Sequence, residues 1–206
     1  MPQEPATHLT QTNYLIATAE REALAGHRGA VVWMTGFSGA GKSNIAVGLD
    51  QYLTGERMRS FVLDGDNLRS GLCADLSFSD EDRHENIRRV GQVAKLMAEA
   101  GIIVICALIS PFTAGRRMVR AICDESSIPF IEVFVNAPLA VCEKRDPKKL
   151  YARARSGAIS GFTGIDSPYE VPQNPELELR TDLIPVNECI QRLSGVVKAK
   201  TNLQHP

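Results

Sequence analysis

The sequence predicts an α/β fold in three layers, with a five-stranded parallel sheet flanked by helices. Short apolar runs alternate with segments of helical periodicity along most of the chain, as expected for strands joined by crossover helices. The longest apolar run, residues 102–109, is rich in β-branched residues, which is typical of the middle strand of a parallel sheet. The 206 residues contain no internal repeat, and one domain accounts for them.

The first half of the chain supplies the early elements of this pattern. Residues 13–25 carry apolar side chains at helical spacing, and Gly26 follows as a stop signal. Residues 30–35 are a nearly continuous apolar run and predict a strand. Helical spacing over residues 42–53 and a short apolar run at 60–63 predict the next helix and strand.

The second half continues the alternation. Residues 81–100 predict a long helix with one apolar face, ended by Gly101, and the strand at 102–109 follows. The later helices and strands are expected, in chain order, at residues 114–124, 130–135, 139–144, 179–184 and 186–198. Residues 1–28 are expected to form an N-terminal segment with the first helix, and residues 29–206 the main domain.

Composition and charge exclude several classes of protein. A formal net charge of −1 gives no electrostatic basis for binding nucleic acid or an anionic membrane surface. No apolar run approaches the ~20 residues that span a bilayer, and the opening residues lack the basic and apolar regions of a signal peptide. The five cysteines contain no Cys-x-x-Cys pair, so buried free thiols are expected rather than a metal site. We expect a cytoplasmic protein.

Residues 36–43 carry the most specific chemistry, because they read Gly-x-x-x-x-Gly-Lys-Ser between a predicted strand and a predicted helix. Glycines allow backbone amides to face phosphate oxygens, Lys42 reaches the β- and γ-phosphates, and Ser43 can ligate Mg²⁺. A chance glycine-rich turn is the alternative, and the flanking elements argue against it. The sequence predicts that ATP or GTP is bound by a phosphate loop made of Gly36, Phe37, Ser38, Gly39, Ala40, Gly41, Lys42, Ser43 and Asn44.

Polar residues after the second strand are the next candidates, because ligands of open parallel sheets bind beyond the carboxyl ends of the strands. Asp64 and Asp66 lie there, whereas the strand at 102–109 carries no aspartate at its end. The two aspartates are therefore expected to orient the acceptor and, through Asp64 together with Ser43, to hold Mg²⁺. A plain turn is the alternative interpretation of Asp-Gly-Asp, and the nearby phosphate loop favours the functional one.

Two charged segments admit two interpretations each. Arg83 and Asn86 lie three apart on the long helix and suit an anionic acceptor, or they belong to a solvated, salt-bridged surface. The basic residues 143–155 include Arg145, which is expected to contact the nucleotide. This segment suits a mobile lid, over about residues 146–170, that closes on the phosphates, or it is a solvated basic helix.

Taken together, residues 36–43, 64–69, 82–89, 110–112 and 162–170 resemble the adenylylsulfate kinase (APS kinase) family of P-loop kinases. Many enzymes share the phosphate loop, whereas residues 64–69 and 162–170 are specific to this family. The resemblance implies a P-loop NTPase-type fold and Mg·ATP-dependent phosphorylation of the 3′-hydroxyl of adenosine 5′-phosphosulfate. The products would be 3′-phosphoadenylylsulfate and ADP. It also implies a homodimer.

The resemblance further implies roles for single residues. Phe78 and Phe162 would enclose the adenine of the acceptor by stacking. Arg69, Arg83 and Asn86 would hold its phosphosulfate group. The acceptor side of the site is thus expected to combine two aromatic walls with positive charge.

Ser110 falls where the family is sometimes assigned a phosphoserine intermediate. We expect a binding or positioning role for Ser110 instead, because direct in-line transfer needs no covalent intermediate.

This chain also departs from the family pattern. Ala158-Ile159-Ser160 stand where the family usually has Glu-Ile-Lys, which removes a cation near the acceptor. Thr113-Ala114-Gly115 replace a more usual Arg-Ala-Asp, and Asn44 replaces a common threonine. Two other functions therefore stay open: a P-loop kinase for another small molecule, and a nucleotide-binding homologue with reduced or lost transfer activity.

Overall fold

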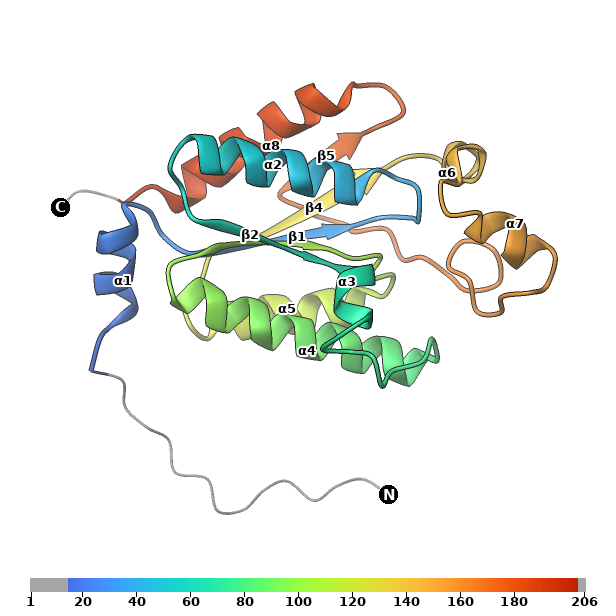
Figure 1. The fold of residues 1–206 in the computed structure, drawn as a ribbon, viewed down its shortest axis with the longest axis horizontal. Coiled ribbons are helices and arrows are strands. Elements are labelled where there is room, and N and C mark those ends of the chain that lie inside the picture. The colour runs from blue at the N-terminus through green and yellow to red at the C-terminus, as the bar shows by residue number, and fades with distance from the viewer. Residues whose placement is uncertain (1–14, 204–206) are drawn as a thin grey trace, which may run out of the picture.

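The computed structural model describes residues 15–203, and within them lies one sheet of five parallel strands in the order β2-β3-β1-β4-β5 (Figure 1). The strands are β1 (Ala30–Thr35), β2 (Ser60–Asp64), β3 (Ile103–Ala107), β4 (Phe130–Asn136) and β5 (Leu177–Arg180). Every residue of β1 and β3 is buried, which is why both read as continuous apolar runs. The predicted fold class is confirmed.

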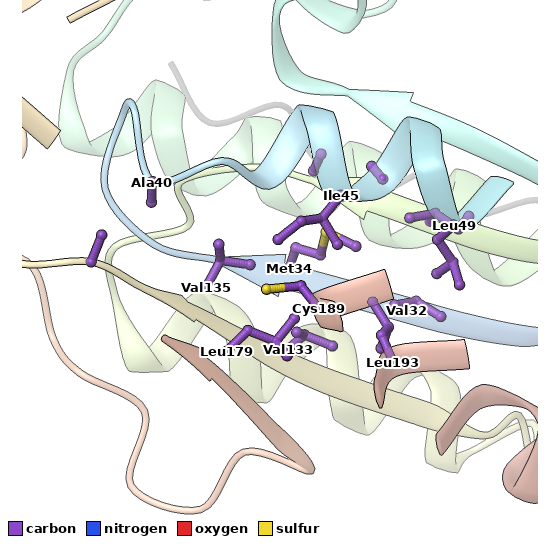
Figure 2. Packing of buried hydrophobic residues seen from close by; sticks show 14 of the residues in the cluster. Val32, Met34, Ala40, Ile45, Leu49, Val133, Val135, Leu179, Cys189 and Leu193 are labelled. Carbon is purple, nitrogen blue, oxygen red and sulfur yellow. The ribbon is translucent and has the colours of Figure 1, made fainter. Parts of the chain in front are cut away.

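Helices cover both faces of the sheet, as Figure 1 shows. One face carries α2 (Lys42–Gly55) and α8 (Val186–Thr201), and the other carries α4 (Asp80–Glu99) and α5 (Thr113–Asp124). Side chains of a strand alternate between faces. Val32 and Met34 of β1 therefore pack in the cluster under α2 and α8 (Figure 2), whereas Trp33 packs in the cluster under α4 and α5.

Four shorter helices lie at the ends of the sheet. They are α1 (Thr18–Ala25), α3 (Gly65–Arg69), α6 (Leu139–Arg145) and α7 (Leu150–Arg155). The helices α3, α6 and α7 lie toward the carboxyl ends of the strands, and α1 lies at the opposite end (Figure 1). Among the described residues, no helix is both long enough and apolar enough to cross a membrane.

Several element boundaries differ from the sequence-based expectation. The first helix begins at Thr18 rather than at residue 13, because the Glu20 carboxylate accepts a 3.1 Å hydrogen bond from the Ala17 amide and closes the helix start there. Residues 13 and 14, like the rest of the expected N-terminal segment before them, lie outside the described part of the chain. The third strand spans Ile103–Ala107 rather than residues 102–109, although Leu108 still donates to the Met34 carbonyl and Ile109 accepts from the Gly36 amide, at 3.4 Å each.

The last strand was expected at residues 179–184, and the structure places it at Leu177–Arg180. The chain leaves the sheet because the amides of Leu183 and Ile184 both donate to the Arg180 carbonyl, at 3.0 Å each. An ion pair of 2.8 Å between Arg180 and Asp182 holds the same turn.

The helix α3 was not expected, and α7 lies where a basic helix was one of two interpretations. The Asp64 side chain accepts a 3.0 Å hydrogen bond from the Asp66 amide and caps α3, so the Asp-Gly-Asp sequence starts a helix rather than a plain turn. The Asp146 carboxylate similarly accepts from the Leu150 and Tyr151 amides, at 2.8 and 3.2 Å, and starts α7 within the expected lid. The first amides of a helix have no carbonyl partner within the helix, and in both cases an aspartate side chain accepts their hydrogen bonds instead.

The cysteines behave as the sequence predicts, because all five are free and buried. No group of three potential metal-ligating His, Cys, Asp or Glu side chains occurs in the part of the chain that the structure describes.

Candidate active site

The phosphate loop joins β1 to α2 at the carboxyl end of the central strand. Gly36 has a φ of 147°, and a Cβ there would lie 2.3 Å from the Val135 carbonyl oxygen of β4. Only glycine therefore fits this close approach. Because α2 begins at Lys42, the unpaired amides and the positive end of its dipole meet the loop. The loop and helix start together form an anion-binding site of the type that holds nucleotide phosphates.

Lys42 supplies the cation of this loop. Its side chain is 8% exposed, and its ammonium donates 2.8 Å hydrogen bonds to the carbonyl oxygens of Gly36 and Phe37. Burial lowers the pKa of Lys42 to about 8, because desolvation disfavours the charged form. A phosphate beside the ammonium would favour the charged form again.

Ser43 and the two aspartates meet beside the loop. The Ser43 hydroxyl donates a 2.7 Å hydrogen bond to Asp64 Oδ2, while Asp64 Oδ1 accepts from the Asp66 amide. The Asp66 carboxylate forms an ion pair with Lys148, which precedes α7. A hydroxyl and one carboxylate are hard oxygen donors, and Mg²⁺ in phosphoryl-transfer sites takes few protein ligands besides phosphates and water. Ser43 and Asp64 thus fit a Mg²⁺ site.

The two phenylalanines expected on the acceptor side have different surroundings. Phe78 is 64% exposed, and the Arg69 guanidinium lies 4.1 Å from its ring centroid. Arg69 also donates to the Ser77 carbonyl at 2.9 Å, which fixes its position over the ring. Phe162 is 9% exposed and packs edge-on against Tyr151, with 5.0 Å between ring centroids. One ring is open to ligand and the other is anchored in the core.

Arg83 connects the two segments that carry these rings. Its Nε donates to the Phe78 carbonyl at 2.9 Å, its Nη1 donates to Thr163 Oγ1 at 3.1 Å, and its Nη2 donates to the Gly161 carbonyl. One turn along α4, Asn86 is buried, and its Oδ1 accepts no hydrogen bond from the described residues. A buried acceptor of this kind is costly unless a partner reaches it.

The remaining charges of this helix follow the alternative interpretation of a salt-bridged surface. Glu85 pairs with Arg88 at 2.6 Å and with Arg89 at 2.9 Å, and Arg89 also pairs with Asp75 at 2.6 Å. Hydrogen bonds from the two arginines lower the pKa of Glu85 to about 2. Glu85, Arg88 and Arg89 therefore follow the interpretation of a salt-bridged surface, and acceptor binding by Arg83 and Asn86 stays a prediction.

The basic segment after β4 packs on the phosphate loop. Tyr151 is buried, and its hydroxyl donates a 2.9 Å hydrogen bond to the Ser38 carbonyl. Arg145 donates to the Gly39 carbonyl at 3.3 Å and to the Thr181 carbonyl at 2.7 Å. The expected lid thus contains a helix with one buried face, and no signal in the sequence separated Tyr151 from the basic residues around it.

Ser110 lies beyond the end of β3 and is 3% exposed. Its hydroxyl accepts a 3.1 Å hydrogen bond from the Trp33 indole. Its carbonyl accepts from the Arg116 guanidinium at 2.8 Å and from the Thr35 hydroxyl at 3.2 Å. A non-glycine residue at a φ of 36° is strained and persists only when its surroundings fix it. The sequence offered no sign of Arg116, which sits in an ordinary charged run.

The segment 161–170 lies directly against the phosphate loop. The Tyr169 hydroxyl is 2.9 Å from Thr35 Oγ1, and its ring centroid is 4.8 Å from that of Phe37. At Gly164, which has a φ of 92°, a Cβ would come within 2.9 Å of both Phe37 and Leu139. The segment 161–170 and the phosphate loop are thus in contact. Nothing in the sequence indicated a separate role for Tyr169, which lies within the family-specific segment 162–170.

A parallel sheet in this order, with the phosphate loop after its central strand and a lysine, a serine and an aspartate together beside it, defines a P-loop kinase. Comparison with known proteins then narrows the class. The family model described as adenylylsulphate kinase matches residues 28–180, and the chain belongs to this family.

Individual relatives are similar in sequence to this chain over most of its length. An adenylyl-sulfate kinase of Marinobacter nauticus is 55% identical over 188 residues, which are 91% of this chain and 94% of that protein. One of Citrobacter koseri is 54% identical over 180 residues, 87% of this chain and 89% of the relative. The solved Mycobacterium tuberculosis APS kinase CysC, in complex with AMPPNP and APS, is 47% identical with a TM-score of 0.81. That match covers 83% of this chain and 98% of the other.

Proposed function

We propose that this protein is an adenylyl-sulfate kinase, which transfers the γ-phosphoryl group of Mg·ATP to the 3′-hydroxyl of adenosine 5′-phosphosulfate. The products are ADP and 3′-phosphoadenylylsulfate. The observation that carries the proposal is the contact between the family-specific segment 162–170 and the phosphate loop, through Tyr169, Phe37 and Thr35. This contact brings an acceptor held at Phe162 beside the nucleotide phosphates, as in-line transfer requires.

On the nucleotide side, the phosphate-loop amides and Lys42 bind the β- and γ-phosphates and neutralise charge that develops during transfer. Ser43 and Asp64 would hold Mg²⁺, which would supply positive charge against the transferring phosphate. Arg145 and the buried face of α7 cover the loop and exclude water from the transferring group. Water would otherwise compete with the acceptor hydroxyl.

On the acceptor side, Phe78 and Phe162 stack on the adenine. Asn86 Oδ1, which has no partner in the described residues, accepts a hydrogen bond from the bound acceptor. Arg69 lies beside Phe78 and binds the phosphosulfate group of the same acceptor. Asp66 orients the 3′-hydroxyl and receives its proton when the acceptor takes the place of Lys148 at its exposed carboxylate, whereas Asp64 stays paired with Ser43 beside the phosphate loop. For Arg83 we propose a role in fixing the Phe78 and 161–167 segments, since its hydrogen bonds go to both.

An assay of ADP release across a panel of acceptors tests the function. ADP is expected from ATP only when adenosine 5′-phosphosulfate is present. Equal turnover with gluconate, shikimate or a nucleoside monophosphate would instead identify a kinase for another small molecule. Binding of both ligands without ADP release would identify a homologue that has lost transfer activity.

The exposed Ser160 motivates a companion variant. Ser160→Lys is expected to lower the KM for the acceptor by about ten- to a hundredfold by restoring a cation near its phosphosulfate, because one charged hydrogen bond contributes about 1.5–3 kcal/mol. An unchanged KM would mean that this chain does not use a cation at position 160.

We also propose that the protein is a cytoplasmic homodimer. Reduced, buried cysteines suit the cytoplasm, where ATP is available. The α1 region exposes apolar side chains, with Leu15 98% and Leu24 88% exposed, and such groups favour burial against a second copy. Light scattering of the wild type should give twice the chain mass, and Leu24→Glu should reduce it. A monomeric wild type would refute the dimer.

A further inference from the structure

Arg116 of α5 is a buried cation that joins three segments around the site. It is 2% exposed, and its guanidinium makes four hydrogen bonds. Nε donates to Glu132 of β4 at 2.7 Å, and Nη1 donates to the Ser110 carbonyl at 2.8 Å. Nη2 donates to the Glu170 carbonyl at 2.8 Å and to Thr113 Oγ1 at 3.2 Å. A planar guanidinium can satisfy several acceptors at fixed angles, which a lysine ammonium cannot do.

The segment around Ser110 depends on these bonds. Ser110 keeps a positive φ of 36°, and Arg116 donates the shorter hydrogen bond to its carbonyl, at 2.8 Å. The Thr35 hydroxyl is 3.2 Å from the same carbonyl but only 2.7 Å from that of Ile109. Strain of this kind relaxes when the groups that impose it are removed. The Ser110 hydroxyl would then leave the Trp33 indole, which is its donor at 3.1 Å.

The last residue of the segment 161–170, Glu170, is also bound by Arg116. The Glu170 amide donates to the Pro111 carbonyl at 2.9 Å, and the Glu170 carboxylate accepts from the Thr113 amide at 2.7 Å. Arg116 adds the third bond, to the Glu170 carbonyl. The preceding residue is Tyr169, which contacts Thr35 and the ring of Phe37. Arg116 thus fixes the end of the segment that carries Phe162.

We propose that Arg116 is a positioning residue for the phosphoryl transfer. It aligns the Ser110 segment and the segment 161–170 relative to the phosphate loop, and it touches neither substrate. The kinetic part of this inference rests on the proposed function, whereas its structural part does not. The Arg116–Glu132 pair neutralises two otherwise buried charges, and the remaining three hydrogen bonds hold the geometry of the acceptor side.

The test compares Arg116→Met and Arg116→Lys with a matched control, Arg120→Met. Arg120 lies one turn along α5 and contacts Glu132 at 3.5 Å and Glu176 at 2.8 Å, but it donates to neither Ser110 nor Glu170. Both methionine variants should lower the melting temperature, because each removes a partner of a carboxylate. Only the variants at Arg116 should raise the acceptor KM, by about tenfold or more, since small misplacements cost this much. The KM for ATP should stay within about threefold in all variants.

Arg116→Lys separates positioning from stability. Lysine can pair with Glu132, so the melting temperature should recover, while the acceptor KM should stay raised because one ammonium cannot also hold Ser110 and Glu170. This variant also decides the question if Arg116→Met does not fold. Two outcomes would reduce Arg116 to a structural role and overturn the proposal. One is that Arg116→Lys restores both the melting temperature and the acceptor KM, and the other is that the Arg116 variants lower the melting temperature but keep the wild-type KM.

Trp33 gives a second measurement that needs no substrate, since it is the only tryptophan of the chain. Its emission maximum should shift more in both Arg116 variants than in Arg120→Met, because only the former release the Ser110 hydroxyl from the indole, whereas Arg120 reaches Trp33 only through the ring of Phe130. Unchanged emission in Arg116→Lys would overturn the structural part. If the wild type released no ADP with the acceptor, the proposed function would fail while this result stood.

Discussion

The Ser43 hydroxyl donates a 2.7 Å hydrogen bond to the Asp64 carboxylate, although the two residues follow strands that are not neighbours in the sheet. Ser43 comes after β1 and Asp64 ends β2, with β3 between them. The bond therefore depends on the topology, which brings the carboxyl ends of parallel strands to one edge. It also divides the work of the two aspartates, because Asp66 takes no part in it.

This division predicts different outcomes for two matched variants. Asp64→Asn should raise the Mg²⁺ concentration needed for half-maximal rate and lower kcat by about a hundredfold, because the amide loses a charge opposite the metal. Asp66→Asn should lower kcat with an unchanged Mg²⁺ dependence. A Mg²⁺ titration of initial rates distinguishes them, and a shifted Mg²⁺ dependence in Asp66→Asn would contradict the division.

The lowered pKa of Lys42 predicts a pH dependence. Burial brings this pKa to about 8, so the charged form predominates below that pH and is lost above it in the free enzyme. Only the charged form attracts the phosphates, so kcat/KM for ATP should fall as pH rises through about 8. With ATP already bound, the phosphates hold the proton, and kcat should stay level to higher pH. A kcat/KM that is level to pH values well above 8 would contradict this assignment.

The exposed ring of Phe78 predicts a loss confined to the acceptor. Phe78→Ala removes a stacking wall worth about 1–3 kcal/mol and should raise the acceptor KM by about five- to a hundredfold. Stability should hardly change, because the side chain is 64% exposed. Phe61→Ala is the matched control, since Phe61 is 53% exposed on the edge strand β2 and should leave the KM unchanged. An equal effect of both variants would remove Phe78 from the acceptor site.

The hydrogen bond between Trp33 and Ser110 predicts that no phosphoserine forms. The Ser110 hydroxyl is buried and engaged with the indole, so transfer should go directly to the acceptor. Incubation with γ-labelled ATP in the absence of acceptor should leave the protein unlabelled. Ser110→Ala should keep a kcat within about tenfold of the wild type, because it loses one neutral hydrogen bond. Stoichiometric labelling that Ser110→Ala abolishes would restore the covalent route.

The sequence was most informative where the chemistry is local. The phosphate loop, its strand and its helix are contiguous, so spacing alone located Lys42 and Ser43. The alternating clusters on β1 likewise follow from a periodicity of two. Caps were harder to foresee, because Asp64 and Asp146 start α3 and α7 through side-chain hydrogen bonds whose geometry no pattern of residue types specifies.

Long-range contacts were beyond the sequence for a different physical reason. Arg83 was expected on the phosphosulfate group, and its hydrogen bond to Thr163 became visible only in the folded chain, because 80 residues separate the two. Arg116 and Glu132 are 16 residues apart on an ordinary helix and strand. Neither contact can be read from the nearby sequence, because each depends on how the helices and strands pack together in the folded chain.

The close packing at Gly164 limits how this enzyme can be redesigned. Any side chain at position 164 would clash with both Phe37 of the phosphate loop and Leu139. A library of variants that changes only residues 161–170 would therefore weaken ATP binding in many of its members. Engineering toward a different alcohol would have to vary positions 37, 139 and 164 jointly, as one steric unit.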